Sequence, residues 1–200
     1  MTTSVTAAVE GATDEAVVFA LCENLGLHLG ASYVTNGKDR LDKNIKGYNN
    51  AARHSPWLVL RDLDHDAECA PLLVKNLLPN PSRYMRFRLA VREVECRLMA
   101  DIENFADYMG ISKSILSDNP EDLDDPKAFL INAAMKSKKR KIREDVPPRA
   151  NSGARVGPGY GSVISEFAQK YWRPEKAAKK SDSLKRCIKR LRELKRKISL

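Results

Sequence analysis

Acidic residues gather at a few points of the sequence, and their spacing suggests metal-assisted chemistry. Glu10 follows a run of small and β-branched residues, and Asp62 and Asp64 follow the apolar run 57–60. Alternate residues of a strand share a face, so we expect Asp62 and Asp64 to point the same way. Two carboxylates ~4 Å apart repel by about 4 kcal/mol at an effective dielectric of 20, which favours a bound divalent cation. Oxygen ligands of this kind suit Mg²⁺ or Mn²⁺.

Other interpretations of the segment after Asp62 can be compared by spacing. A calcium loop that starts there would need Gly and Glu where Ala67 and Leu73 stand, so that interpretation is excluded. A phosphatase of the aspartyl-phosphate type also has Asp-x-Asp after an apolar strand, but normally with Thr where this chain has Asp66. A purely structural alternative is a polar turn in which Asp66 caps the next helix. The last two alternatives stay open.

The elements that must position these acids are predicted to alternate between strand and helix. This alternation predicts an α/β fold: a Rossmann-like core with a mainly parallel sheet and flanking helices. Such sheets carry functional residues at the carboxyl ends of their strands, where Glu10 and Asp62 would stand, and Glu95 would begin the helix after a third strand. The expected strands are 3–9, 33–35, 57–60 and 84–90, and the expected helices are 13–25 (with Thr13 as its cap), 38–53, 67–78 and 91–109.

Charge divides the chain into two parts. Up to Met135 there are 14 basic and 20 acidic residues, whereas the remainder has 21 basic and 6 acidic residues. We therefore expect a catalytic core over 1–110 and a basic, mostly helical segment over 111–200, packed on the core or appended to it. The longest apolar run, 16–22, is too short to cross a membrane. Four dispersed cysteines and the lack of a secretory signal predict a cytoplasmic protein with reduced thiols.

The basic segment suggests contact with a polyanion. Aromatic residues among its bases, Tyr160, Tyr171 and Trp172, would be able to stack on unpaired bases. Alternatively, these aromatics and the apolar stripe of the expected helix 182–199 pack against the core and leave the charge outward. The candidate nucleic-acid-binding residues are Lys138, Lys139, Arg140, Lys185, Arg186, Lys189 and Arg190.

Three sequence phrases in this order resemble the Toprim domain of topoisomerases, primases and several nucleases. They are Glu10-Gly11-Ala12-Thr13-Asp14, Asp62-Leu63-Asp64 and the stretch from Glu93 to Asp101. The third phrase is most similar to the nuclease branch named for overcoming lysogenization defect. It departs from that branch at Glu93 and at Arg97, where other residue types are common. The resemblance covers roughly residues 3–110.

The resemblance implies a Toprim nuclease that hydrolyses phosphodiester bonds of DNA or RNA with Mg²⁺ or Mn²⁺. It implies that Glu10 acts as a metal ligand or general acid–base group and that Asp62 and Asp64 hold the ion. Asp14 and Glu95 would complete a second metal site if two metals are used, and one or two metals are both open. It also implies an assisting lysine, an ATPase partner and a role in phage defence. The alternative function is a non-catalytic module that binds nucleic acid or an acidic partner. The candidate lysines are Lys136, Lys138, Lys139 and Lys141.

Overall fold

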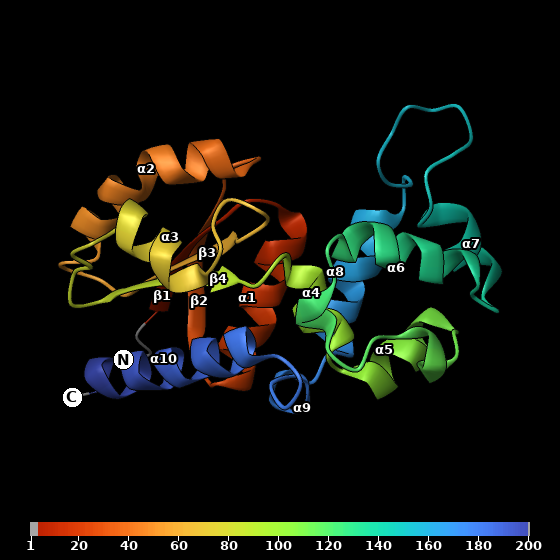
Figure 1. The fold of residues 1–200 in the computed structure, drawn as a ribbon. Helices are drawn as coiled ribbons and strands as arrows, with labels where there is room; N and C mark the ends of the chain where they lie inside the picture. The colour runs from red at the N-terminus through yellow and green to blue at the C-terminus, as the bar shows by residue number, and fades with distance from the viewer. Residues whose placement is uncertain (1–3, 200) are drawn as a thin grey trace.

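The computed structural model describes residues 4–199 and has an α/β architecture, with a sheet between two layers of helices (Figure 1). No helix in this described range is long and apolar enough to cross a membrane. The strands are β1 (Ser4–Val9), β2 (His28–Val34), β3 (Trp57–Asp62) and β4 (Met85–Ala90). The helices are α1 (Ala12–Asn24), α2 (Lys38–Ala51), α3 (Ala70–Leu77), α4 (Val94–Met99), α5 (Ile102–Met109), α6 (Pro126–Met135), α7 (Arg140–Asp145), α8 (Tyr160–Lys170), α9 (Pro174–Ala177) and α10 (Asp182–Ile198), with 3₁₀ turns at Lys113–Ile115 and Pro120–Asp122.

The sheet is parallel throughout and has the strand order β2-β1-β3-β4. The chain therefore adds β2 on one side of β1 and then β3 and β4 on the other side. The order reverses between β1 and β3, and open α/β sheets bind their ligands at this kind of position. The predicted Rossmann-like core is confirmed at the level of an α/β fold with a parallel sheet.

The two faces of the sheet are buried in separate apolar clusters. One face, with Val59 and Phe87, packs under α2 and α3 through residues such as Leu41 and Leu73. The other face belongs to a larger cluster that includes α1, α4, α8 and α10. Burial on both faces explains why β3 has the continuous apolar run typical of a central parallel strand.

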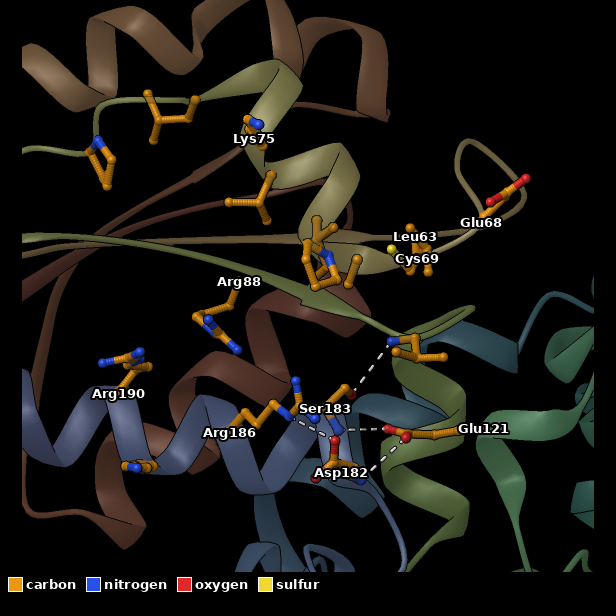
Figure 2. Close-up of a pocket in the computed structure, with 18 of the residues that line it drawn as sticks. Leu63, Glu68, Cys69, Lys75, Arg88, Glu121, Asp182, Ser183, Arg186 and Arg190 are labelled. Atoms are coloured by element: carbon orange, nitrogen blue, oxygen red, sulfur yellow. Dashed lines mark hydrogen bonds and ion pairs between the residues drawn. The ribbon is translucent and has the colours of Figure 1, made fainter.

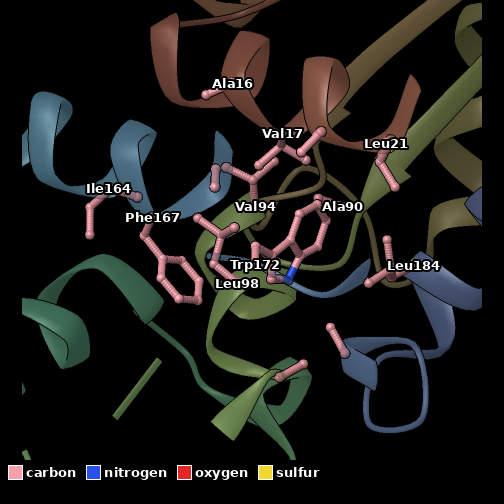
Figure 3. Packing of buried hydrophobic residues seen from close by; sticks show 14 of the residues in the cluster. Ala16, Val17, Leu21, Ala90, Val94, Leu98, Ile164, Phe167, Trp172 and Leu184 are labelled. Carbon is pink, nitrogen blue, oxygen red and sulfur yellow. The ribbon is translucent and has the colours of Figure 1, made fainter. Parts of the chain in front are cut away.

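The C-terminal half of the chain is packed on the core. Trp172 lies among residues of α1 and α4 in one cluster (Figure 3), and its indole N–H donates to the Arg97 carbonyl at 3.1 Å. The apolar stripe of α10, which includes Leu184 and Leu191, is buried in the same cluster. The Lys195 ammonium at the far end of α10 donates to the Leu25 carbonyl at 2.7 Å. The inward-packing alternative is therefore the correct one for this stripe and for Trp172.

Several predicted boundaries were wrong for local reasons. Gly11, not Thr13, precedes the first turn of α1, with the Asp14 carboxylate accepting the Gly11 N–H at 2.8 Å. The expected helix 91–109 divides into α4 and α5 at Asp101, because this carboxylate is buried and paired with Arg173 at 2.6 Å. The first expected strand begins at residue 3, which lies outside the described residues.

Candidate active site

Two predicted acids meet at the reversal of the strand order. Glu10 follows the last residue of β1, and Asp62 is the last residue of β3. The Glu10 Oε1 atom accepts the backbone N–H of Asp62 at 2.9 Å. Parallel pairing of β1 with β3 brings the two ends together, because the carboxyl ends of parallel strands lie at the same edge. Positions 52 residues apart in the sequence are thus neighbours in space.

Two further predicted acids reach this place from the starts of helices. Asp14 lies in the first turn of α1 and Glu95 in the first turn of α4, and both are buried, with 5% and 2% of their surface exposed. Asp62 Oδ1 accepts the N–H of Val94, which holds the beginning of α4 against β3. Among the described residues, Asp14 Oδ1 and Glu95 Oε2 are buried without a hydrogen-bond partner. Both oxygens are therefore free to bind a cation.

Mutual repulsion and burial shift the titration of these acids. Burial, followed by the charges of Glu95 and Glu10, raises the pKa of Asp14 to about 7. Burial, followed by the charges of Asp14, Glu95 and Glu10, raises the pKa of Asp62 well above its ordinary value. Burial also raises the pKa of Glu10. The four side chains therefore form one electrostatic cluster, called the carboxylate centre below: Glu10, Asp14, Asp62 and Glu95.

A lysine that the sequence did not single out lies beside Glu95 of the carboxylate centre. Lys127, in the first turn of α6, places its ammonium 3.0 Å from Glu93 and 3.7 Å from Glu95. Burial lowers the pKa of Lys127, but Glu95 and Glu93 outweigh it and leave the pKa above its ordinary value. Tyr160 of α8 donates its hydroxyl to Glu95 Oε1 at 2.6 Å.

The four lysines considered from the sequence lie elsewhere. Lys136, Lys138, Lys139 and Lys141 are exposed, and within residues 4–199 none of them forms an ion pair with the carboxylate centre. The Lys139 ammonium donates instead to the Tyr108 carbonyl at 2.7 Å. The position of Lys127 depends on how α6 packs on α4. The only sequence signal near it is Asp125-Pro126, which is typical of a helix start but carries no chemistry.

Asp64 does not share a strand face with Asp62, so that argument from alternation was wrong. β3 ends at Asp62, and Asp64 has a left-handed backbone, with φ of 49°. Its carboxylate turns to Lys38 at 2.9 Å, next to Asp66, which pairs with Lys38 and Arg61 at 2.8 and 2.6 Å. Asp66 is an ion-pair partner and not a helix cap. Asp64 remains close enough to raise the pKa of Glu10.

A pocket of ≈ 570 Å³ lies beside the carboxylate centre. None of the four acids of the carboxylate centre lines this pocket. Its charged lining comprises the bases Lys38, Arg92, Lys127 and Arg155 and the acids Asp64, Asp66, Glu93, Asp124 and Asp125. Its size suits a small polar ligand, and its mixed charge offers contacts to both anionic and cationic groups.

The predicted nucleic-acid-binding residues fall in two separate places. Lys138, Lys139 and Arg140 lie at the start of α7, where Arg140 pairs with Glu144 at 2.8 Å. The other four lie exposed along α10, opposite its buried stripe. Among the aromatics suggested for base stacking, Trp172 and Tyr160 are buried and only Tyr171 is well exposed.

The residues of the carboxylate centre fit a hard divalent cation by chemistry. Their donors are all oxygens, two of them lack any hydrogen bond, and Mg²⁺ prefers oxygen ligands. The side chains are nevertheless too far apart to form a complete coordination shell. Within residues 4–199, no group of three or more His, Cys, Asp or Glu side chains is close enough to hold a metal ion. Binding would therefore require small side-chain movements toward the ion.

Comparisons of this chain with protein-family models, with curated proteins and with solved structures found no match. The functional interpretation therefore rests on the residues and their geometry.

Proposed function

We propose that the protein is a metal-dependent phosphodiesterase that cleaves nucleic acid, as the resemblance to Toprim nucleases implies. The observation that supports it most is the burial of Asp14, Asp62 and Glu95 beside Glu10, where the strand order reverses, with two oxygens left unpartnered. Buried like charges destabilise a fold unless something compensates them. The two cations that act on these acids, Lys127 and Arg61, are already paired with Glu93 and with Asp42 and Asp66, respectively. A divalent ion would supply the remaining positive charge.

The proposed roles follow from the surroundings of each side chain. Asp62 and Glu95, both buried, would hold the ion with Asp14, and the ion would neutralise the scissile phosphate and activate a water. Glu10 is the least buried of the four and has a raised pKa, so it is best suited to exchange a proton with solvent. Lys127 would orient Glu95 and add charge facing the pocket beside the carboxylate centre.

The direct test is cleavage of labelled DNA and RNA with Mg²⁺ or Mn²⁺. We expect Asp62→Asn to reduce cleavage at least ~100-fold, because it removes a charged ligand but keeps the shape and the oxygen that accepts the Val94 N–H. The matched control is Asp107→Asn on the exposed side of α5, which should keep full activity. Equal activity of Asp62→Asn and Asp107→Asn would refute the proposal.

A second candidate is a binding module without catalysis, which the exposed bases of α10 favour. Lys185 and Lys189 form no ion pair with any described acid, so both are available to phosphates. Charge reversal at Lys189 and Arg190 should abolish nucleic-acid binding if this is the whole function, whereas cleavage of short substrates should persist if α10 is an accessory. The ATPase partner and the defence role stay predictions.

A further inference from the structure

A second pocket, of ≈ 850 Å³, lies between α3 and α10 along the free edge of β4 (Figure 2). Its two walls differ in chemistry. The wall near α3 is apolar and includes Pro71, Val74 and Leu78. The wall formed by α10 is basic, and Figure 2 shows Arg88 extending from the strand toward it. The cations that line the pocket are Lys75, Arg88, Arg186, Lys189 and Arg190.

A fully buried guanidinium lies behind this pocket. Arg97 of α4 has 0% of its surface exposed. It donates to the Leu89 carbonyl at 2.7 Å and to the Ser183 hydroxyl at 3.3 Å, and both residues line the pocket. Burial lowers the pKa of Arg88 most, the charges of Arg97 and Arg190 lower it as well, and the neighbouring Cys187 side chain opposes them. Arg88 and Arg97 are thus two neighbouring positive charges.

Neither arginine has a counter-charge among residues 4–199. No carboxylate in this range lies within ion-pair distance of Arg88 or Arg97. The Arg88 Nε and Arg97 Nη1 atoms are buried without a hydrogen-bond partner. Guanidinium groups do not lose their proton in proteins, so this charge persists at every accessible pH.

The acids around the pocket are engaged elsewhere. Glu121 caps the start of α10, where it accepts the Ser181 hydroxyl at 2.6 Å and the Ser183 N–H at 3.1 Å. Asp182 and Arg186, which both line the pocket, pair with each other at 2.7 Å and so compensate each other's charge. Glu68 is exposed at the rim. The positive charges of Arg88 and Arg97 could therefore be neutralised by an anion that the protein binds from solution.

We propose that this pocket binds a phosphate monoester, with the phosphate against Arg88 and Lys189 and the organic part against the apolar wall; Arg190, which pairs with Glu193 at 2.7 Å, borders the site. A guanidinium group matches phosphate oxygens in two-point hydrogen bonds, which favours phosphate over a spherical anion. The volume lies within the range of sites for small organic ligands. This site is separate from the carboxylate centre and does not depend on the proposed cleavage.

The phosphate monoester has two sources, a free nucleotide or the 5′-phosphate end of a nucleic acid. Calorimetric titrations on the full chain carrying Asp62→Asn, in EDTA, exclude cleavage and metal binding. The probes are adenosine monophosphate, adenosine, and one oligonucleotide with and without its 5′-phosphate. Binding of the monophosphate but not of adenosine supports a free nucleotide. Binding confined to the 5′-phosphorylated oligonucleotide supports a strand end. Equal binding with and without phosphate, or no binding of any probe, overturns the proposal.

Variants in the pocket provide the matched comparison. Arg88→Met should weaken binding about 10- to 100-fold, since it removes charged hydrogen bonds to the phosphate. Lys189→Met should weaken it about 3- to 10-fold because Lys189 is exposed. Lys197→Met lies on the same helix but outside the pocket and should leave the affinity unchanged. If Lys197→Met and Lys189→Met lower the affinity equally, the binding is non-specific attraction to α10 and the proposal fails.

Discussion

The carboxylate centre and the pocket along β4 both concentrate charge of one sign inside the protein, but only the carboxylate centre can lose its charge by titration. The acids at the ends of β1 and β3 are able to take up protons, and burial already raises the pKa of Asp14 to about 7. Arg97 and Arg88 have no such option, because a guanidinium keeps its proton. The anionic centre therefore responds to pH and metal, whereas the cationic pocket should respond mainly to anions.

The largest expected effect is on stability as a function of pH in the absence of metal. Because the pKa of Asp14 is raised on folding, the folded state binds more protons than the unfolded state between the two pKa values. The contribution of Asp14 to the free energy of unfolding is therefore fully present below pH ~4 and is lost as the pH rises through about 7. The shift from 3.8 to about 7 corresponds to about 4 kcal/mol at most.

Urea unfolding in EDTA at pH 5 and pH 8 measures this effect. The wild-type protein should lose stability between the two pH values more steeply than Asp14→Asn, which removes the titrating group. Asp107→Asn serves as the exposed control and should follow the wild type. Identical pH dependence in all three proteins would contradict the electrostatic description of the carboxylate centre.

Metal should reverse this trend. Mn²⁺ requires the deprotonated acids, so its affinity should rise with pH. At 100 times its dissociation constant a bound ion stabilises the fold by about 2.7 kcal/mol. Differential scanning calorimetry with Mn²⁺ should show this gain in the wild type and its loss in Glu95→Gln. A gain of the same size in Glu95→Gln would place the ion elsewhere.

Removal of the cation beside the centre should have a smaller effect. Lys127→Met removes the cation that holds down the pKa of Glu93, so we expect that pKa to rise further and cleavage to fall about 10- to 100-fold. The pH at half-maximal activity should move upward, which a purely structural role of Lys127 would not produce. Lys136→Met, at an exposed position just after α6, should leave both the rate and the pH profile unchanged.

The smallest expected effect concerns the buried guanidinium of Arg97 and its contribution to the free energy of unfolding. Arg97→Met removes an uncompensated buried charge together with two hydrogen bonds, and these effects oppose each other. We expect a change in unfolding free energy within about 1 kcal/mol, independent of pH between 5 and 8. Denaturant unfolding at both pH values measures it. A strong pH dependence would show that an acid compensates Arg97.

The sequence patterns that predicted the fold are local ones. The fully apolar strand β3, the alternation in β4 and the strand–helix order are properties of short segments, and they indicate a parallel sheet without knowledge of contacts. The ends of parallel strands must then coincide, so the proximity of Glu10 and Asp62 was predictable. Asp14 followed from the resemblance and from the helix that begins beside Glu10.

The features that escaped prediction depend on contacts between distant segments. Lys127 reaches Glu93 only because α6 packs on α4, and Asp64 leaves the strand face because the chain turns just after Asp62. Asp101 lies inside the expected helix 91–109, yet it is buried and paired with Arg173 at the point where that helix divides. Arg97 has an ordinary helical context, so no periodicity marks it as a buried guanidinium.

The position of α10 has a consequence for how the protein is made. It begins 92 residues after β4 ends, yet Leu184 and Leu191 complete the core around α1. At about 5–20 residues per second, a nascent chain would wait roughly 5 to 20 seconds between the synthesis of the sheet and that of this helix. During that interval Leu21 and Cys22 would lack the apolar side chains of α10 that cover them in the folded protein, and transiently exposed apolar surface of this kind favours aggregation.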